Sequence, residues 1–353
     1  MNRKKSIVEY DMLRVVLTLL VVIGHCYYYE IATNYGGIDY NNLYSHNLME
    51  IFLEFLKNTI YVFHMPAFIA LSGALFFYSI ERVREGGFYS FIREKGLRLL
   101  VPYLVVSLLY SFPLKLSTGY FSGCSSIVKA EIIGQILVQG NTHLWYLLTL
   151  FCLFILAFVL EKIDRNSHIV KFFVLLIISS VYVLIPIKII AYIVQYLPWF
   201  YLGIVFEENR MNINSTISLK KIIFSGGLLC VGSYVLNYFL KNRIKGSIWL
   251  LIDYLMIFVG CYFIYSLSFG ISKTKLVNKR IFRKIKEHSF GIYLYSDGIN
   301  YIFLYIASAI GIRFNSNILT LTVFCARFVI TLVVSLFLSM VLKSKIVNAK
   351  YIA

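Results

Sequence analysis

The sequence is dominated by apolar runs of about twenty residues, the length that a helix needs to cross a membrane, and short polar stretches rich in Lys and Arg separate them. Hydrophobic residues make up 59% of the 353 residues and charged residues only 14%. Ordinary soluble domains have roughly half and a quarter, so a conventional soluble protein is excluded. The pattern predicts an all-α, polytopic integral membrane protein that forms a single domain over residues 1–353.

Hydropathy windows predict about ten transmembrane helices. Asp11 and Arg14 interrupt the first run, and no small-residue cleavage site follows it, so we expect this run to stay as a span and not to be removed as a signal peptide. The pattern of the later part of the outer connection 30–59 predicts an amphipathic surface helix. The expected spans are 10–29, 60–80, 97–112, 143–161, 169–185, 187–206, 220–240, 247–268, 289–309 and 317–342.

The net formal charge of +17 arises from 34 Lys and Arg against 17 Asp and Glu. These basic residues lie in short loops and not on one amphipathic surface, which argues against nucleic acid as a partner. With the N-terminus inside, 24 Lys and Arg fall in inner segments and 8 in outer ones, and the other two, Arg14 and Arg327, lie inside spans. Because positively charged loops stay in the cytoplasm, both termini are predicted to be cytoplasmic. The exceptions, expected outside, are Lys241, Arg243 and Lys245.

The six cysteines show no paired spacing, and all but Cys124 fall inside apolar runs. Cysteine in such a run behaves as a small hydrophobic residue. The sequence therefore predicts neither disulfides nor a zinc site, and no bound metal.

The first span carries two ionisable residues, Arg14 and His25. Eleven residues amount to three turns plus about 20°, so both side chains lie on one face of the helix, about 16 Å apart along its axis. Arg14 is then near the cytoplasmic end and His25 near the outer end. Ionisable residues inside a span are candidates for function, although a snorkelling arginine and a hydrogen-bonded interfacial histidine remain the alternative.

Two further histidines are expected at the depth of His25. His64 lies about four residues from the outer end of the second span, and His143 opens the fourth. Three histidines at one depth predict a polar pocket in the outer leaflet. The alternative for His143, which precedes Trp145, is an interfacial aromatic belt.

A basic cluster precedes the third span, near the expected depth of Arg14. Arg93, Lys95 and Arg98 are followed by Leu-Leu-Val-Pro. Cations at a helix N-terminus suit phosphate groups. Ordinary anchoring by the positive-inside rule is the alternative.

The later spans also contain charged residues. Asp297 and Arg327 fall near one depth, which permits an ion pair between them, and such a pair would make both residues structural. Asp253 has no obvious partner in the sequence, which leaves a neutral state or a role in a site open.

These motifs, in this order, resemble the acyltransferase-3 family of integral membrane acyltransferases, especially its branch that O-acetylates sugars. The Arg-x10-His spacing is the specific element, and the ordered set from residue 11 to about 297 strengthens the likeness. The matching elements are Asp11-x-x-Arg14 with His25, Phe63-His64-Met65-Pro66 leading to Ser72-Gly73, Arg93/Lys95/Arg98, His143-Leu-Trp-Tyr-Leu, Trp199-Phe-Tyr-Leu-Gly203 and Ser289-Phe-Gly-Ile-Tyr293-Leu294.

The resemblance implies about ten helices and transfer of an acyl group, usually acetyl from acetyl-CoA. The acceptor would be a hydroxyl of a cell-surface glycan, a lipid-linked saccharide or a similar molecule. Two positions depart from the family. Many members have Arg where this chain has Lys95, and many have His shortly after Tyr-Leu, where this chain has Ser296-Asp297.

The expected chemistry assigns roles to these residues. A hydroxyl is a poor nucleophile at neutral pH, so a base within about 3 Å of its proton must assist the attack on the thioester. His25 is the predicted base, with a transient acyl-histidine as the mechanistic alternative. Arg14 belongs to the same catalytic set, and His64, Ser72 and Tyr61 are expected to orient the acceptor or stabilise the oxyanion.

The acetyl-CoA phosphates are expected to bind at Arg14, Arg93, Lys95 and Arg98.

Two other classes of protein fit the same residues. A transporter or exporter of an anionic or sugar-linked solute would line its pathway with buried arginine and histidine. A non-catalytic membrane sensor or scaffold is the third hypothesis, because a fold does not dictate a function.

Overall fold

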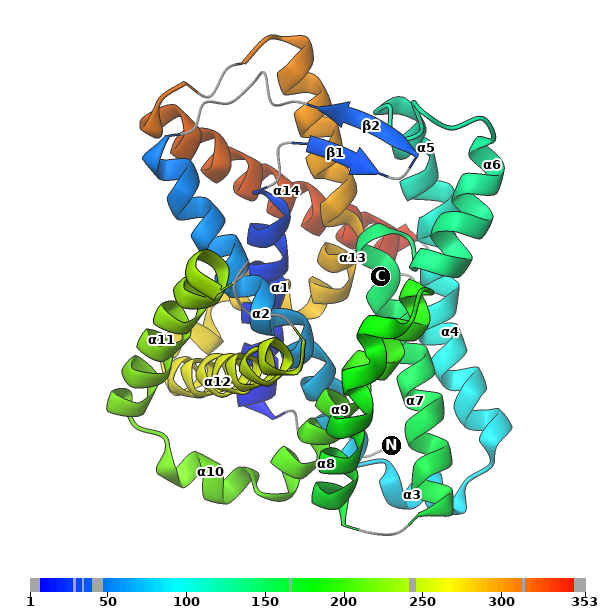
Figure 1. Cartoon of the computed structure of the whole chain (residues 1–353), viewed down its shortest axis with the longest axis vertical. Helices are drawn as coiled ribbons and strands as arrows, with labels where there is room; N and C mark the ends of the chain where they lie inside the picture. The colour runs from blue at the N-terminus through cyan, green and yellow to red at the C-terminus, as the bar shows by residue number, and fades with distance from the viewer. Residues whose placement is uncertain are drawn as a thin grey trace.

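The structure is a computed structural model that describes residues 7–27, 30–33, 35–39, 47–164, 167–240, 246–312 and 315–345. It is a bundle of helices with one short antiparallel hairpin, β1 (Glu30–Thr33) with β2 (Gly36–Asp39) (Figure 1). The α-helices are α1 (Val8–His25), α2 (Leu48–Phe77), α3 (Ile80–Glu85), α4 (Phe88–Val106), α5 (Phe112–Ser117), α6 (Ile127–Lys129), α7 (Trp145–Ile163), α8 (His168–Ser179), α9 (Lys188–Glu208), α10 (Arg210–Thr216), α11 (Leu219–Tyr234), α12 (Ser247–Ser272), α13 (Arg280–Ala309) and α14 (Asn317–Lys345).

Short π- and 3₁₀-helical segments extend or connect these helices. They are the π-helices η2 (Ser107–Ser111), η3 (Ala130–Gln139) and η6 (Val235–Leu240) and the 3₁₀-helices η4 (Thr142–Leu144), η5 (Ser180–Leu184) and η7 (Lys275–Asn278). Because η2 joins α4 to α5, the third predicted span belongs to one helical segment, Phe88–Ser117.

The all-α membrane fold that the sequence predicts is confirmed. A helix lies at each of the ten expected spans. Among the residues that the structure describes, seven helical segments are long and apolar enough to cross a membrane. The protein is a multi-pass membrane protein. The orientation of its termini stays a prediction, and Lys241, Arg243 and Lys245 lie outside the described residues.

The second span differs from its prediction. The expected surface helix in 30–59 and the expected span 60–80 form one continuous helix, α2, which begins at Leu48. The Asn47 side chain caps it by accepting a hydrogen bond from the backbone N–H of Glu50, 3.0 Å away. No proline or glycine lies between the two predicted parts, so nothing in the sequence ends the helix there. Its first turns carry exposed apolar side chains, with Leu48 75% exposed.

Helices α2 and α9 pack backbone against backbone. A Cβ atom at Gly73 would lie 1.9 Å from the carbonyl oxygen of Phe200, and one at Gly203 would lie 1.9 Å from that of Ala70. Any side chain at position 73 or 203 would collide with these carbonyl oxygens, so only glycine allows the two helices to come this close. The two glycines therefore form a close contact between the helices, and α9 lies directly against the second span.

A buried carboxylate ties together the ends of α3, α7, α8 and α9. Glu161 has no exposed surface and accepts hydrogen bonds from Arg84 at 2.7 Å and Lys171 at 2.8 Å. Tyr201 donates to it at 3.2 Å, and the Nε2 atom of His168 lies 3.3 Å away. A buried charge is tolerated when it is paired and hydrogen-bonded, so this cluster fixes the relative positions of these helices.

A second ionic cluster joins the start of α1 to the end of α9 and to α10. Glu207 accepts hydrogen bonds from the hydroxyls of Tyr10 and Tyr78, and Arg210 contacts Glu207 at 3.0 Å and Glu9 at 2.5 Å. Burial disfavours the charged guanidinium, but the hydrogen bonds and charges of the two carboxylates outweigh burial and raise the pKa of Arg210 above its ordinary value.

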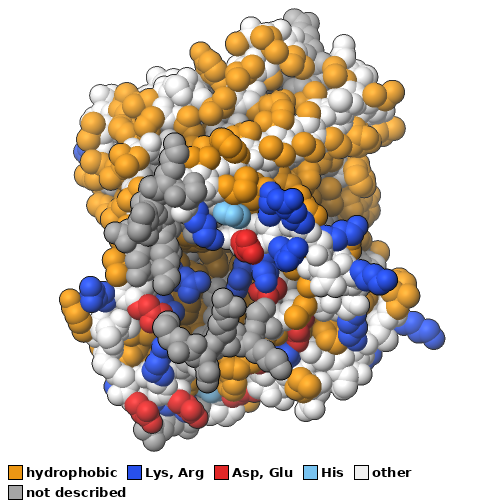
Figure 2. Space-filling model, turned by 180° about the vertical axis from the view of Figure 1, so that it is seen from behind, with side chains coloured by type: hydrophobic (Ala, Val, Ile, Leu, Met, Phe, Trp, Pro, Cys, Tyr) orange, Lys and Arg blue, Asp and Glu red, His pale blue; other side chains and the backbone are white. Residues whose placement is uncertain are grey.

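Charged and apolar surfaces are segregated. Figure 2 shows one face on which hydrophobic side chains cover the upper part, whereas Lys and Arg gather around a recess in the middle and lower part. This arrangement is typical of a protein whose apolar surface faces lipid and whose basic residues lie outside the hydrocarbon region.

Candidate active site

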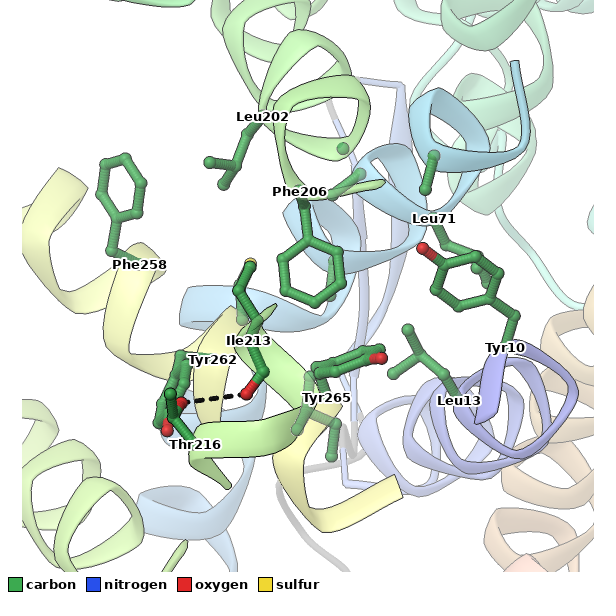
Figure 3. A pocket seen from close by; sticks show the side chains of 16 residues that line it. Tyr10, Leu13, Leu71, Leu202, Phe206, Ile213, Thr216, Phe258, Tyr262 and Tyr265 are labelled. Carbon is green, nitrogen blue, oxygen red and sulfur yellow. Dashed lines mark hydrogen bonds between the residues drawn. The ribbon is translucent and has the colours of Figure 1, made fainter. Parts of the chain in front are cut away.

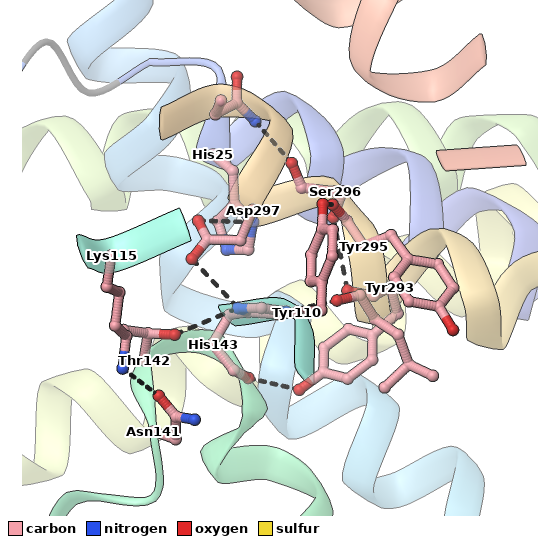
Figure 4. A network of polar contacts seen from close by, with 12 residues as sticks. His25, Tyr110, Lys115, Asn141, Thr142, His143, Tyr293, Tyr295, Ser296 and Asp297 are labelled. Atoms are coloured by element: carbon pink, nitrogen blue, oxygen red, sulfur yellow. Dashed lines mark hydrogen bonds and ion pairs between the residues drawn. The ribbon is translucent and has the colours of Figure 1, made fainter. Parts of the chain in front are cut away.

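Three helical segments that are far apart in the sequence bring two imidazoles to one carboxylate. His25 ends α1, His143 lies in η4, and Asp297 lies in the middle of α13. The Nδ1 atom of His143 lies 3.1 Å from one Asp297 oxygen, and the Nδ1 atom of His25 lies 3.7 Å from the other. The two rings meet edge to face with centroids 5.8 Å apart. Figure 4 shows Asp297 between the two histidines.

Helix α13 holds both the ring and the backbone carbonyl of His143. Its Nε2 atom lies 3.2 Å from the carbonyl oxygen of Leu294. The hydroxyl of Tyr293 donates a hydrogen bond to the carbonyl of His143. Both partners belong to α13, so the same helix that supplies Asp297 also positions the histidine that contacts it.

The turn before His143 has an unusual backbone. Gly140, Asn141 and Thr142 have φ values of 85°, 56° and 50°, a conformation that is uncommon outside glycine and an outlier for a β-branched residue. Lys115 donates hydrogen bonds to the Asn141 side chain and, at 2.8 Å, to Glu131. This buried network of hydrogen bonds holds the turn in place.

His64 lies beside the same site, as the depth of the second span predicts. Its Nδ1 atom donates to the carbonyl of Ile60 at 2.9 Å, and its ring packs against Tyr61 with centroids 5.0 Å apart. The hydroxyl of Tyr61 donates to the carbonyl of Gly24 at 3.2 Å, which ties α2 to the end of α1. His64 and His25 are close enough to interact electrostatically.

A second polar group lies around Arg14, at the other end of α1. Arg14 is near Asp11, with 3.9 Å between their closest charged atoms, and it interacts electrostatically with Arg98 and Tyr146. The hydroxyl of Ser72 lies 3.3 Å from that of Tyr146. Ser72 therefore contacts the Arg14 group, whereas His25 and His143 meet at Asp297.

The tyrosines of α7 and α13 connect the two groups. The ring of Tyr146 lies 5.6 Å from that of Tyr293, and the ring of Tyr293 lies 5.6 Å from that of His143. A continuous row of packed polar rings thus runs from the neighbourhood of Arg14 to the histidines.

The three residues of the basic cluster before the third span differ in their surroundings, although Lys95 and Arg98 interact electrostatically. Arg98 reaches the neighbourhood of Arg14, but Lys95 lies over the ring of Phe154, 4.4 Å from its centroid, and 3.7 Å from Glu94. Arg93 is exposed. Of these three residues, Arg98 is the one whose electrostatic interaction with Arg14 is resolved, while the contacts of Lys95 also fit an anchoring role.

Sequence reasoning did not find the contacts of Asp297 with His25 and His143. The expected partner was Arg327, which is fully buried with its guanidinium 5.6 Å from the ring of Phe303. Ion pairs join Asp297 to His25 and to His143, and the pair of Asp297 with Arg327 stays a prediction. The sequence feature that could have indicated these contacts is a carboxylate inside a span at the depth of three histidines. Asp253, half-buried in α12, lies near tyrosines of α9 and η5.

A cavity of about 280 Å³ lies elsewhere, between α1, α2, α9, α10 and α12 (Figure 3). Its lining is almost entirely apolar and includes Tyr10, Leu13 and Phe206. Tyr10 and Leu13 precede His25 by 15 and 12 residues, which is roughly 18–22 Å along a helix. A reacting acyl carbon held there would not reach the histidines, so this cavity is separate from the group formed by His25, His143 and Asp297.

No group of three or more His, Cys, Asp or Glu side chains that could hold a metal ion occurs among the described residues. The arrangement instead offers a base beside a carboxylate at one end of α1 and a pair of guanidinium groups at the other. Such a site can remove a proton from a hydroxyl and bind an anionic substrate.

Comparison with known proteins gives one family. The family model described as an acyltransferase domain matches residues 7–340. A nodulation protein, NolL, of Mesorhizobium japonicum is 30% identical over 166 residues, 45% of this chain and 37% of that protein. A probable poly-beta-1,6-N-acetyl-D-glucosamine export protein of Staphylococcus aureus is 24% identical over 173 residues, 49% of this chain and 44% of that protein. The matches thus span less than half of these relatives. No solved structure matches the chain.

Proposed function

Because the chain belongs to the acyltransferase-3 family of integral membrane acyltransferases, we propose that it moves an acetyl group from acetyl-CoA to a hydroxyl of a cell-surface glycan or lipid-linked saccharide. One observation carries this proposal. Helix α1 presents Arg14, beside Arg98, near one end and His25, paired with Asp297, at the other.

The donor would bind at the Arg14 end. Guanidinium groups bind phosphates through charge-assisted and bidentate hydrogen bonds, and Arg14 and Arg98 supply two of them in one place. CoA carries its thioester at the end of a long pantetheine arm, far from its phosphates. About 16 Å of helix separates Arg14 from His25, so an extended arm laid along the row of tyrosines would bring the thioester toward the histidines.

The reaction would take place at His25. In the proposed step its Nδ1–H faces the Asp297 carboxylate, so its Nε2 accepts the proton of the acceptor hydroxyl as the hydroxyl oxygen attacks the acetyl carbonyl carbon. The new C–O bond replaces the C–S bond of the thioester. The thiolate leaves and takes the proton from His25, which restores the neutral imidazole. Asp297 stabilises the transient imidazolium, as carboxylates do beside catalytic histidines.

The acceptor class rests on the relatives. The staphylococcal relative is named for an amino-sugar polymer, and sugars present the secondary and primary hydroxyls that such a base would activate. His64 and Tyr61 line the same end of α1 and are the proposed residues for orienting the sugar.

The name of that relative also favours a second candidate, export of a saccharide. The same buried arginines and histidines would then line a path for an anionic or sugar-linked solute. The two candidates differ in one observable. An acyltransferase releases CoA in the presence of acceptor, whereas an exporter moves its solute without acetyl-CoA.

The function is tested by mass spectrometry of surface glycans and lipids from a deletion strain, from cells complemented with the wild-type gene and from cells complemented with the His25→Gln variant. The proposal predicts one acetyl mass on a saccharide of the wild-type cells only. Identical masses in all three strains, with polymer retained inside the deletion strain, would contradict it and favour export. A phenotype restored by His25→Gln without any mass change would favour a non-catalytic scaffold.

A further inference from the structure

The cavity between α1, α2, α9, α10 and α12 offers few polar contacts to a ligand (Figure 3). Three hydroxyls in its wall already donate hydrogen bonds within the protein. The Tyr10 hydroxyl donates to Glu207. The Tyr265 hydroxyl donates to Asn214 at 2.7 Å, and that of Thr216 donates to a backbone carbonyl of α10 at 2.9 Å. A buried water needs about two to four polar partners, so the lining favours an apolar occupant.

The burial of the lining residues shows where the cavity opens. Tyr10, Leu13 and Ala74, from α1 and α2, are 2%, 5% and 2% exposed. On the other side, Leu202 of α9 and Tyr262 of α12 are partly exposed, and Thr216 at the end of α10 is exposed. Leu202, Tyr262 and Thr216 therefore form the mouth of the cavity, between α9 and α12.

The protein surface on both sides of this mouth is apolar. Helix α11, which packs against α12, exposes Ile223 by 66% and Phe224 by 72%. Helix α8, which packs against α9, exposes Phe173 by 56% and Ile177 by 74%. Because side chains of this kind on the outside of a membrane protein contact acyl chains, the mouth opens toward lipid.

An acyl chain is the group that the surroundings supply to such a cavity. The lining residues of α2 and α12 belong to segments that can cross a membrane, where hydrocarbon and not water is the solvent. An empty cavity would lose the dispersion contacts of its lining. Its volume of about 280 Å³ is about twice that of an engineered apolar cavity of about 150 Å³ that binds benzene, which suits part of one chain.

Exposed lysines lie near the mouth. Lys220 and Lys221 follow Thr216 by four and five residues, a distance of at most about 17 Å along the chain. Lys273 follows the last residue of α12, near the place where a Cβ at Gly270 would lie 3.5 Å from a side chain of α11. The ends of α11 and α12 thus bring three positive charges together, and lysines at a membrane surface attract anionic lipids.

We propose that the cavity binds one acyl chain of an anionic phospholipid, whose phosphate lies against Lys220, Lys221 and Lys273. The chain fills the space beside α10, beyond the place where the rings of Trp199 and Phe258 join α9 to α12 with centroids 5.2 Å apart. Binding belongs to the resting protein, so it does not depend on the proposed acyl transfer.

The direct test is photolabelling of the full chain in phosphatidylcholine bilayers. The probe is a phosphatidylglycerol that carries a diazirine at the end of one acyl chain, and mass spectrometry locates the labelled residues. We expect label on Leu13 or Ala74, which bilayer lipid reaches only through the cavity, as well as on the exposed Phe224. Label on lipid-facing residues alone would overturn the proposal.

Two variants close the cavity at its mouth. Leu202→Trp enlarges a lining side chain, and Thr216→Trp places a bulky ring at an exposed position, where a larger side chain is easily accommodated. The matched control is Leu228→Trp on α11, which is 43% exposed and does not line the cavity. Both mouth variants are expected to lower the labelling of Leu13 severalfold, and the control is expected to leave it unchanged. Equal labelling of Leu13 in all three would overturn the proposal.

The headgroup is tested by changing the probe. The same diazirine chain on phosphatidylcholine, or as a free fatty acid, is expected to label the cavity severalfold less than on phosphatidylglycerol. In the triple variant Lys220→Gln, Lys221→Gln, Lys273→Gln, phosphatidylglycerol and phosphatidylcholine are expected to label the cavity equally. A free fatty acid that labels as strongly as phosphatidylglycerol, or a preference for phosphatidylglycerol that survives in the triple variant, would overturn the assignment of the phospholipid.

Discussion

Replacing Lys115 by methionine is predicted to destabilise the folded protein by about 3–5 kcal/mol, the cost of leaving a buried charge without its partner. The Lys115 ammonium lies 2.8 Å from Glu131, and both side chains are only 1% exposed. Methionine fills a similar volume, so the packing of the aliphatic chain is largely kept. What is lost is the counter-charge of Glu131 and the hydrogen bond to Asn141.

A double-mutant cycle separates the ion pair from general damage. Glu131→Gln alone removes the carboxylate charge that neutralises the Lys115 ammonium, so it is also expected to destabilise. Lys115→Met with Glu131→Gln buries no charge, and neutral replacements of a buried pair are often nearly free of cost. The double variant is therefore expected to be more stable than either single variant, a non-additivity that marks residues in direct contact.

The assay is equilibrium unfolding of the purified protein in mixed micelles, read by circular dichroism. The control is Arg82→Met, which breaks the Arg82–Glu94 contact of 3.9 Å, whose side chains are 69% and 52% exposed. Exposed pairs contribute about 0–1 kcal/mol, so the control should unfold like the wild type. The reasoning is refuted if Lys115→Met costs no more than the control, or if the two single losses simply add.

Three further predictions concern the donor site, helix packing and orientation. Arg98→Ala should raise the KM for acetyl-CoA more than it lowers kcat, because contacts to the phosphates stabilise the ground state and the transition state alike. Lys95→Ala should raise this KM by a smaller factor. An unaltered KM in both variants would mean that the cluster only anchors the helix. Gly203→Ala, whose Cβ would lie 1.9 Å from a carbonyl oxygen of α2, should destabilise by about 1–3 kcal/mol. Gly227→Ala in α11, with no atom within 4 Å, should not, and equal stability would refute the close α2–α9 contact. Cysteines placed in 113–142 should react with an impermeant reagent from outside and those in 270–288 should not; outside labelling of the second segment would overturn the orientation.

The parts of the fold that the sequence predicts are those governed by local hydropathy. In a membrane, the backbone N–H and C=O groups of an apolar run must hydrogen-bond to each other, and a helix achieves this. A helix therefore lies at each expected span. The end of a helix is less constrained. Nothing in the sequence separates the amphipathic start of α2 from its membrane part, and the two form one helix.

The candidate site was predictable to the extent that depth determines proximity. Counting turns along α1 and residues from the outer end of later spans places His25, His64 and His143 at one level. Depth alone does not say which helix lies next to which, so the sequence offered Arg327 as a partner of Asp297 and did not indicate its contacts with His25 and His143. The strained turn 140–142 depends on long-range contacts from Lys115 and Tyr293 and has no local signal beyond its glycine.

The most direct test of the proposed function is acceptor-dependent release of CoA by the purified protein in lipid bilayers, with acetyl-CoA and the saccharide found to be acetylated in cells. General base catalysis contributes about 10²–10⁴ in rate, so His25→Gln, which keeps a hydrogen-bonding side chain but no base, should lose that factor. Its protein level and CoA binding should be retained, because Arg14 lies about three helical turns away. Near-normal turnover by His25→Gln would contradict the assignment of His25 as the base.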